Sequence, residues 1–394
     1  MTREIQTKDR LSVDGLANNI QEIQRSTRMT SFFKRILFKK LKGLKTGELT
    51  IIDGSEIHVF GILKSEFKAT LTVSSQEFYV FLGSGGTNGA AEAFTAGYWS
   101  ADNLVELIQI IIRNKKTMEG LESGLARLTN PITKIIHRLR QNTLKGSKSN
   151  ILAHYDLSND FYKLWLDSTM TYSSGIFLNK KSSMLDASVE KLDRLCRKLN
   201  LNSSDHVLEI GTGWGSFATH AAKNYGCKVT TTTISDNQFN YVAELISKEN
   251  LDNKITLLNK DYRELEGVFD KIVSIEMIEA VGSDFVPGFF EKASSLLKKN
   301  GLMALQGITY NDPDFNAYKS SVDFIRKYIF PGSCLISLSQ VEKAIKDKTD
   351  LIMVDSEDIT LHYARTLEIW RKDFENVLPQ VRELGFSDPF IRIW

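Results

Sequence analysis

A glycine-dense turn directly after an apolar run restricts the fold of this chain more than any other feature. Residues 207–217 read VLEIGTGWGSF, where a strand-like run reaches an acid and Gly211, Gly213 and Gly215 follow. Further short β-rich runs (KVTTTTI, KITLLN, KIVSI, GLMALQGI) come later, and helix-like segments separate the earlier ones. Strands that alternate with helices predict an α/β fold with a mostly parallel sheet, whose ligand crevice lies at the carboxyl ends of the strands. We expect the glycine turn to line that crevice.

Length and composition indicate two domains and exclude several classes. A chain of 394 residues is long for one core, and the stretch LKGSKSN at 144–150 reads as a linker. We therefore expect a smaller α+β domain over 1–140 and the α/β domain over 141–394. A net charge of +2 is too small to indicate nucleic-acid binding, and the three separated cysteines predict no metal site. Without a membrane-spanning run or a signal peptide in the sequence, we expect a cytoplasmic location.

The first domain begins with a basic amphipathic segment. Residues 31–45, SFFKRILFKKLKGLK, place an apolar stripe between cations at helical spacing. Such a helix either lies on an anionic bilayer or packs its stripe into a domain core. Residues 47–61 and 68–83 alternate apolar and polar residues, which predicts short antiparallel strands, and NLVELIQIIIRNKK at 103–116 predicts a helix.

The spacing of the glycines indicates which kind of cofactor this turn could bind. The pattern is G-x-G-x-G, not the G-x-G-x-x-G of dinucleotide sites, and the tip of the second strand, TTTTIS, has no ribose-binding acid. A phosphate-binding loop is excluded because no Lys-Ser or Lys-Thr follows the glycines. S-adenosylmethionine fits better, with Glu209 facing its ammonium group and Asp261 its adenine. The alternative is a tight strand-to-helix connection that binds no ligand.

Several motifs together resemble the family of cyclopropane-fatty-acyl-phospholipid synthases and mycolic acid methyltransferases. They are HYDLSNDFYKLWLDSTMTYSSGIF, VLEIGTGWGSFA, TTISDNQ, IVSIEMIEAVG, YIFPGSCLISL and LHYARTLEIWRKDF, with GELTIIDG and EAFTAGYWSADNLVELI in the first domain. The resemblance implies a class I S-adenosylmethionine-dependent methyltransferase fold, Rossmann-like, preceded by the smaller domain. It also implies methyl transfer to the cis double bond of a phospholipid acyl chain, which forms a cyclopropane ring through a carbocation.

The resemblance assigns cofactor contacts one motif at a time. Tyr172 and Ser173 in MTYSS match a cofactor-binding pair, and residues 207–215 match the glycine loop. Thr233 and Gln238 bound the segment that replaces the missing ribose acid, and Tyr262 stands where the family places an aromatic residue near adenine.

The resemblance implies that the base is a bound bicarbonate ion. Fewer residues of the family's bicarbonate site than of its cofactor site are matched in this sequence. Glu279, Tyr363 and Ile308, the last through its backbone, match the family's residues, whereas Ser174 replaces a common cysteine and Gln306 a common histidine. Both replacements keep hydrogen-bonding capacity, so we expect these residues to hold bicarbonate. His154 and His362 also fall in matching motifs, but we expect them to be structural.

The expected partner is an unsaturated phospholipid in a bilayer, met through transient association with the membrane surface. The first domain would serve docking or dimerisation. Two alternatives stay open: a methyl- or methylene-branched product, and a catalytically silent lipid- or cofactor-binding protein. The second arises because the sequence stops at Trp394, where family members usually continue into a last strand, so we expect the methyltransferase domain to lack that segment.

Overall fold

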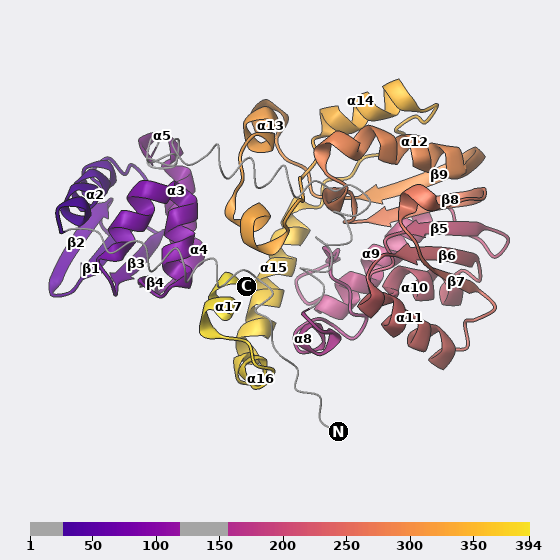
Figure 1. Cartoon of the computed structure of the whole chain (residues 1–394), viewed down its shortest axis with the longest axis horizontal. Helices are drawn as coiled ribbons and strands as arrows, with labels where there is room; N and C mark the ends of the chain where they lie inside the picture. Colours follow the sequence, from indigo (N-terminus) through magenta and orange to yellow (C-terminus); the bar gives the residue numbers. More distant parts are fainter. Residues whose placement is uncertain (1–26, 119–156) are drawn as a thin grey trace. The chain divides into compact units, whose positions relative to one another are not determined.

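The computed structural model describes residues 27–118 and 157–394 and divides the chain into two compact units (Figure 1). Unit 1 is Met1–His137 with Ser321–Ile329 and Phe386–Trp394, and unit 2 is Arg138–Ser320 with Phe330–Gly385. The division between His137 and Arg138 falls beside the predicted boundary. Two later segments that we assigned to the methyltransferase domain group with unit 1 instead. The predicted linker at 144–150 and His154 lie outside the described residues.

Unit 1 is built on a four-stranded sheet in the order β2-β1-β3-β4. Strands β1 (Glu48–Asp53) and β2 (Glu56–Gly61) form the predicted hairpin, but β3 (Lys68–Val73) pairs parallel to β1. The purely antiparallel prediction was wrong because the chain leaves β2 at the edge and crosses to the other side of β1. The unit also contains α2 (Thr27–Leu41), α3 (Glu77–Thr95), β4 (Trp99–Ala101), α4 (Leu104–Arg113), α5 (Lys115–Met118), a π-helical turn (Ile325–Ile329) and α17 (Asp388–Ile393).

Residues 77–82, EFYVFL, begin helix α3, although we included them in a strand region. Phe78, Tyr79 and Phe81 are all buried in the unit's core. A short continuous apolar run is compatible with a buried strand or a buried helix, and periodicity alone does not separate them.

The basic amphipathic segment forms helix α2, whose apolar stripe is part of the core. Phe33, Leu37 and Leu41 are each less than 8% exposed and pack in one cluster with residues of β1 and β3. Lys34 forms ion pairs with Asp53 at 2.6 Å and Glu56 at 3.0 Å. The packed alternative is therefore confirmed, and this stripe is not free to enter a bilayer.

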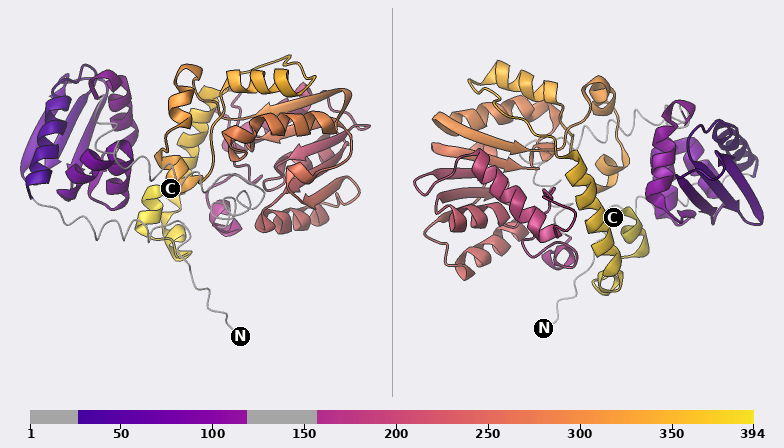
Figure 2. Two further views of the ribbon diagram at one scale, coloured as in Figure 1. Left: turned by 45° about the horizontal axis from the view of Figure 1, so that its top comes forward. Right: turned by 180° about the vertical axis from the view of Figure 1, so that it is seen from behind.

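Unit 2 contains a five-stranded, all-parallel sheet in the order β7-β6-β5-β8-β9. Each strand overlaps one of the predicted runs, and β9 begins four residues earlier and ends two residues earlier than its run. Both faces of the sheet carry helices (Figure 2). They are β5 (His206–Ile210), β6 (Lys228–Thr233), β7 (Ile255–Asn259), β8 (Phe269–Ile275) and β9 (Leu297–Gln306).

Two apolar cores sandwich this sheet. On β5, Val207 packs with α9 (Met184–Lys198), α10 (Ser216–Asn224) and α11 (Asp236–Lys248), whereas Leu208 faces α12 (Val286–Leu296) and α14 (Leu338–Lys348). Successive strand residues point to opposite faces, so a strand that is buried on both faces is apolar throughout. The other helices are α8 (Asn159–Lys163), α13 (Asp312–Lys319), α15 (Thr360–Asn376) and α16 (Leu378–Glu383), with 3₁₀ turns at Tyr262–Glu264, Ile278–Ala280 and Ser283–Phe285. Within the described residues, no helix is long and apolar enough to cross a membrane.

Candidate functional site

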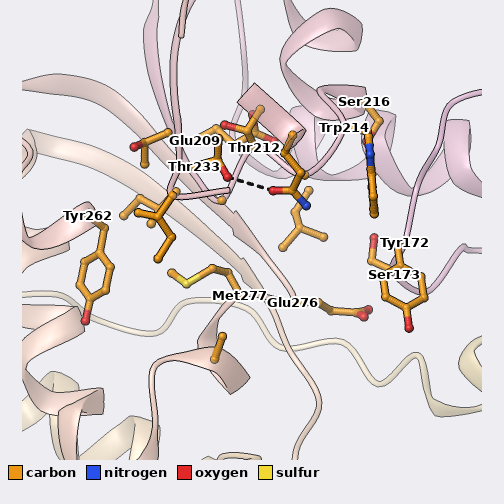
Figure 3. A pocket seen from close by; sticks show the side chains of 18 of the residues that line it. Tyr172, Ser173, Glu209, Thr212, Trp214, Ser216, Thr233, Tyr262, Glu276 and Met277 are labelled. Atoms are coloured by element: carbon orange, nitrogen blue, oxygen red, sulfur yellow. Dashed lines mark hydrogen bonds between the residues drawn. The ribbon is translucent and has the colours of Figure 1, made fainter. Parts of the chain in front are cut away.

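A pocket in unit 2 opens where β5, β6, β7 and β8 end, as the sequence predicts (Figure 3). It has about 1100 Å³ of empty volume, including solvent at its mouth. All three glycines of the loop have positive φ: +102° at Gly211, +54° at Gly213 and +85° at Gly215. A Cβ atom on Gly211 would lie 3.0 Å from the Met277 side chain. Left-handed backbone and close approach both require glycine here.

Glu209 lies at the floor of this pocket on strand β5. It is 2% exposed, and its carboxylate accepts a hydrogen bond of 2.6 Å from the Thr231 hydroxyl. Burial raises the pKa of Glu209 to about 8, although Thr231 and the charge of Lys191 oppose that shift. A buried acid with one donor attracts a ligand's ammonium group, since the cation would restore its ionised form.

The ends of β6 and β7 supply the predicted polar wall. The Thr233 hydroxyl donates to the Gln238 side chain at 2.9 Å, and both residues line the pocket (Figure 3). Asp261 also lines the pocket, but its carboxylate is paired with the Arg263 guanidinium at 2.6 Å. The adenine contact predicted for Asp261 thus has to share that carboxylate with Arg263. Tyr262 packs edge-on against Phe289, with ring centroids 5.5 Å apart, and still borders the pocket.

Aromatic side chains form the wall opposite Tyr262. Tyr172 and Trp214 line the pocket, and their ring centroids lie 6.4 Å apart. Behind them, Tyr162 lies 4.6 Å from Trp214, and Trp370 lies 5.3 Å from Tyr172. Such a wall excludes water and presents electron-rich ring faces to a cation.

Lys191 was not predicted, yet it is 1% exposed and lines the pocket. Its ammonium group donates to the Ser173 hydroxyl at 2.7 Å. Burial lowers the pKa of Lys191 to about 8, and the charges of Glu276 and Glu209 oppose that shift. Its position beside Leu192 on the core-facing side of α9 was a signal, because a lysine there cannot avoid burial.

Glu276 was also missed, and it joins most of the residues expected to hold bicarbonate. Its Oε1 accepts hydrogen bonds from the Ser174 backbone N–H and the Gln306 amide, both at 2.8 Å. Its Oε2 accepts one from the Tyr363 hydroxyl at 3.3 Å. An acid directly after the apolar run KIVSI, like Glu209 after its own run, was the available signal.

Glu279 lies in the same cluster but has different partners. Its Oε1 accepts a hydrogen bond of 2.5 Å from the Ile308 N–H, while its Oε2 is buried without a hydrogen-bond partner among the described residues. Burial and the nearby charge of Glu276 raise the pKa of Glu279 to about 8. Glu279 therefore keeps a proton at neutral pH.

His362 has a structural contact, as expected. Its Nδ1 accepts a hydrogen bond of 3.1 Å from the Phe177 backbone N–H. This contact ties α15 to the chain that follows Tyr172.

The parallel sheet, the left-handed glycines and the buried Glu209 together define a class I S-adenosylmethionine-dependent methyltransferase. The pocket suits that cofactor because its floor offers a carboxylate for an ammonium group and its loop lets backbone approach closely. Two solved structures share this fold. CmaA1, a mycolic acid cyclopropane synthase complexed with SAH and CTAB, is 30% identical with a TM-score of 0.58, over 62% of this chain and 89% of that one. MmaA2, a cyclopropane synthase from Mycobacterium tuberculosis, is 28% identical with the same TM-score and the same coverage.

Residues 142–394 match the family described as mycolic acid cyclopropane synthetase, and the chain belongs to that family. Among curated relatives, the tuberculostearic acid methyltransferase UfaA1 of Mycobacterium tuberculosis is 32% identical over 79% of this chain and 74% of its own length. The cyclopropane-fatty-acyl-phospholipid synthase of Escherichia coli is 31% identical over 83% of this chain and 81% of its own length. The predicted family and fold are confirmed.

Proposed function

We propose that this chain transfers a methyl group from S-adenosylmethionine to the cis double bond of an unsaturated phospholipid acyl chain and forms a cyclopropane fatty acid. The observation that carries the proposal is the carboxylate of Glu276, which lines the same pocket as the aromatic wall of Tyr172 and Trp214. Methyl transfer to an alkene creates a carbocation without a lone pair to quench it. Ring faces stabilise such a cation, and a carboxylate stabilises it and can accept its proton.

The cofactor roles follow from the pocket. Glu209 would hold the ammonium group, the N–H groups of the loop from Gly211 to Gly215 the carboxylate, and Thr233 with Gln238 the ribose. Asp261 and Tyr262 would border adenine. The bound cofactor supplies an electrophilic methyl group. Tyr172 and Trp214 exclude water beside that methyl group. The weakly nucleophilic alkene is then held next to the methyl group, and no water molecule competes with it for the methyl group.

A phospholipid substrate would require the protein to act at a membrane surface. Phospholipid acyl chains reside in bilayers, so we include transient association with a membrane surface in the proposal. On α2, Phe32 is 49% exposed, and the exposed cations Arg28 and Arg35 lie about one helical turn before and after it. A dimer stays a prediction.

The test uses methyl-labelled cofactor and phospholipid vesicles. We expect label in lipid from vesicles with cis-unsaturated chains and none from vesicles with saturated chains of the same headgroup. A protein that binds the cofactor but labels neither lipid would contradict the proposal and support the silent binding protein.

A methyl- or methylene-branched product is the second candidate, favoured by the similarity to a tuberculostearic acid methyltransferase. The two products differ in which carbon loses a proton after methyl transfer. A ring and a methylene branch have equal mass, so fragmentation of the labelled fatty acid has to locate the new carbon. Label in a methylene or methyl branch would replace the cyclopropane proposal.

A further inference from the structure

The hydrogen-bond donors expected for bicarbonate already have an acceptor in this protein. The Ser174 N–H, the Gln306 amide and the Tyr363 hydroxyl all donate to the two carboxylate oxygens of Glu276. The remaining expected donor, the Ile308 N–H, donates to Glu279. A planar carboxylate has the shape and charge of the OCO group of bicarbonate. The residues present therefore do not fit an additional bicarbonate ion.

The backbone of Glu276 supports a functional role. Its φ is +48°, a left-handed conformation that is uncommon for a residue other than glycine, and it comes directly after β8. Its N–H donates to the Gln306 carbonyl at 2.8 Å, which anchors the turn. Strained backbone persists where surrounding structure enforces it, and such sites are concentrated at functional positions.

Glu276 is also the member of this cluster that reaches the cofactor pocket. It lines the pocket together with Ser173 and Lys191, whereas Gln306, Glu279 and Tyr363 are not among the described lining residues. Figure 3 shows its carboxylate pointing toward Tyr172 and Ser173. A carboxylate placed there faces the space in which a methyl acceptor meets the cofactor.

Burial raises the pKa of Glu276 above its usual range, and the Ser174 N–H, the Gln306 amide and the charge of Lys191 oppose that shift. The charge of Glu276 adds to burial in raising the pKa of Glu279 to about 8, so Glu279 keeps a proton at neutral pH. Two carboxyl groups in unlike surroundings can thus be divided into one acid and one base.

We propose that the Glu276 carboxylate takes the place of bicarbonate and is itself the base that completes the reaction. The inference rests on the proposed function for its substrate. The alkene π pair forms the bond to the methyl carbon, whose bond to sulfur breaks with its electron pair left on sulfur. Glu276 then takes a proton from that methyl carbon, and the C–H pair closes the ring onto the cationic carbon. Neutral Glu276 releases the proton to solvent after the products leave.

The first experiment compares methyl transfer with and without bicarbonate. We expect removal of bicarbonate and dissolved CO₂ to change wild-type transfer by less than about twofold. Glu276→Gln should lower transfer by about 10²–10⁴-fold, the usual contribution of a general base, with cofactor affinity within about threefold. Glu291→Gln, on the exposed face of α12, is the matched control and should keep wild-type activity. A wild-type protein that transfers methyl groups only with bicarbonate would overturn the inference and leave the proposed function standing.

The second experiment does not depend on activity. Glu276→Ala leaves a carboxylate-sized space bordered by the same three donors, so we expect it to bind ¹³C-labelled bicarbonate or formate saturably, as seen by NMR line broadening. The wild type and Glu276→Gln should not bind either ion. Retained cofactor affinity and melting temperature would show that the alanine variant is folded.

Saturable bicarbonate binding by the wild type, lost in Gln306→Ala, would overturn the inference even if no lipid is ever methylated. If no unsaturated lipid is methylated and only Glu276→Ala binds bicarbonate or formate, the proposed function is rejected. The inference that Glu276 takes the place of bicarbonate then still stands. Restoration of transfer in Glu276→Ala by added bicarbonate would support both.

Discussion

The two ends of the pocket are built in different ways. The end that would hold the cofactor is made of one short segment, the loop from Glu209 to Gly215, whose shape comes from backbone conformation. The end around Glu276 is made of side chains and backbone from four distant segments, at Ser174, Glu276, Gln306 and Tyr363. A backbone-built site is visible in consecutive letters, whereas an assembled site appears only when the chain is folded.

The comparison also separates two uses of an acid at a strand end. Glu209 lies on the parallel strand β5 and is buried, whereas Glu276 directly follows the parallel strand β8 and is partly buried. Among the described residues, Glu209 accepts one hydrogen bond, from Thr231, and would be completed by a ligand's ammonium group. Glu276 is surrounded by donors from the protein and is ready to accept a proton. The neighbours, rather than the residue type, decide which role a buried carboxylate takes.

The largest effect that tests the cofactor end is Glu209→Gln. Loss of a buried charge-assisted contact costs about 1.5–3 kcal/mol, so we expect affinity for S-adenosylmethionine to fall by about 10–100-fold. Because the pKa of Glu209 is about 8 without ligand, it must lose a proton to pair with an ammonium group. The ionised fraction falls by about 50-fold between pH 8 and pH 6, so wild-type affinity should fall by more than about tenfold over that range, and the variant should show no such trend in calorimetry.

Glu244→Gln, on the exposed side of α11, is the control for that substitution and should bind like the wild type. Equal affinity of Glu209→Gln and wild type would break the comparison, since it would leave Glu209 a purely structural acid.

A smaller effect is expected for Gly211→Ala. At a φ of +102°, a Cβ atom is strained and would also lie 3.0 Å from Met277, so we expect cofactor affinity to drop by about tenfold. Gly267 has a similar φ, +106°, and is not among the pocket residues, so Gly267→Ala is a closely matched control. Both variants should lose stability, measured as melting temperature, but Gly211→Ala alone should lose affinity. Equal losses of cofactor affinity in Gly211→Ala and Gly267→Ala would show that the glycine loop affects cofactor binding only through the stability of the fold.

The smallest effect is expected for Glu279→Gln. Since the neutral acid dominates at pH 7, a glutamine reproduces its acceptor for the Ile308 N–H, and methyl transfer should fall by less than about threefold. The raised pKa means that wild-type stability decreases as the pH rises from about 5 to about 8. Over that pH range, the melting temperature of the variant should fall by a few degrees less than that of the wild type. A loss of transfer in Glu279→Gln as large as in Glu276→Gln would make Glu279 an essential member of the base.

Much of the fold was predictable from the sequence, and the exceptions have physical reasons. The five strands of unit 2 contain short runs rich in apolar or β-branched residues and are separated by turns and helices, so their identity and direction follow from the sequence pattern. Residues 77–82 were misassigned because a short apolar run does not distinguish a helix from a strand. The parallel pairing of β1 with β3 was missed because pairing partners are not encoded locally.

The candidate site shows the same division at the level of residues. The predicted cofactor residues other than Gly215 line the pocket: Tyr172, Ser173, Glu209, Gly211, Gly213, Thr233, Gln238, Asp261 and Tyr262. Gly215 is the N-cap residue that precedes α10 and is not among the lining residues. Ser174, Gln306 and Tyr363 come together as expected, but around Glu276 rather than around an open space. Lys191 lies on the buried side of the α9 pattern and Glu276 directly follows an apolar run, but both were missed because neither pattern says which groups a charge will contact.

By itself, the sequence determined the parallel α/β fold, the glycine loop and the family, because these depend on local periodicity, positive φ and contiguous motifs. Only the tertiary structure decided that the stripe of α2 belongs to a core and that Glu276 occupies the donors expected for bicarbonate. Both depend on which side chains meet across long separations in the chain. Hydrogen bonds and burial act through space, so the partner of a buried charge is known only once the fold has brought the segments together.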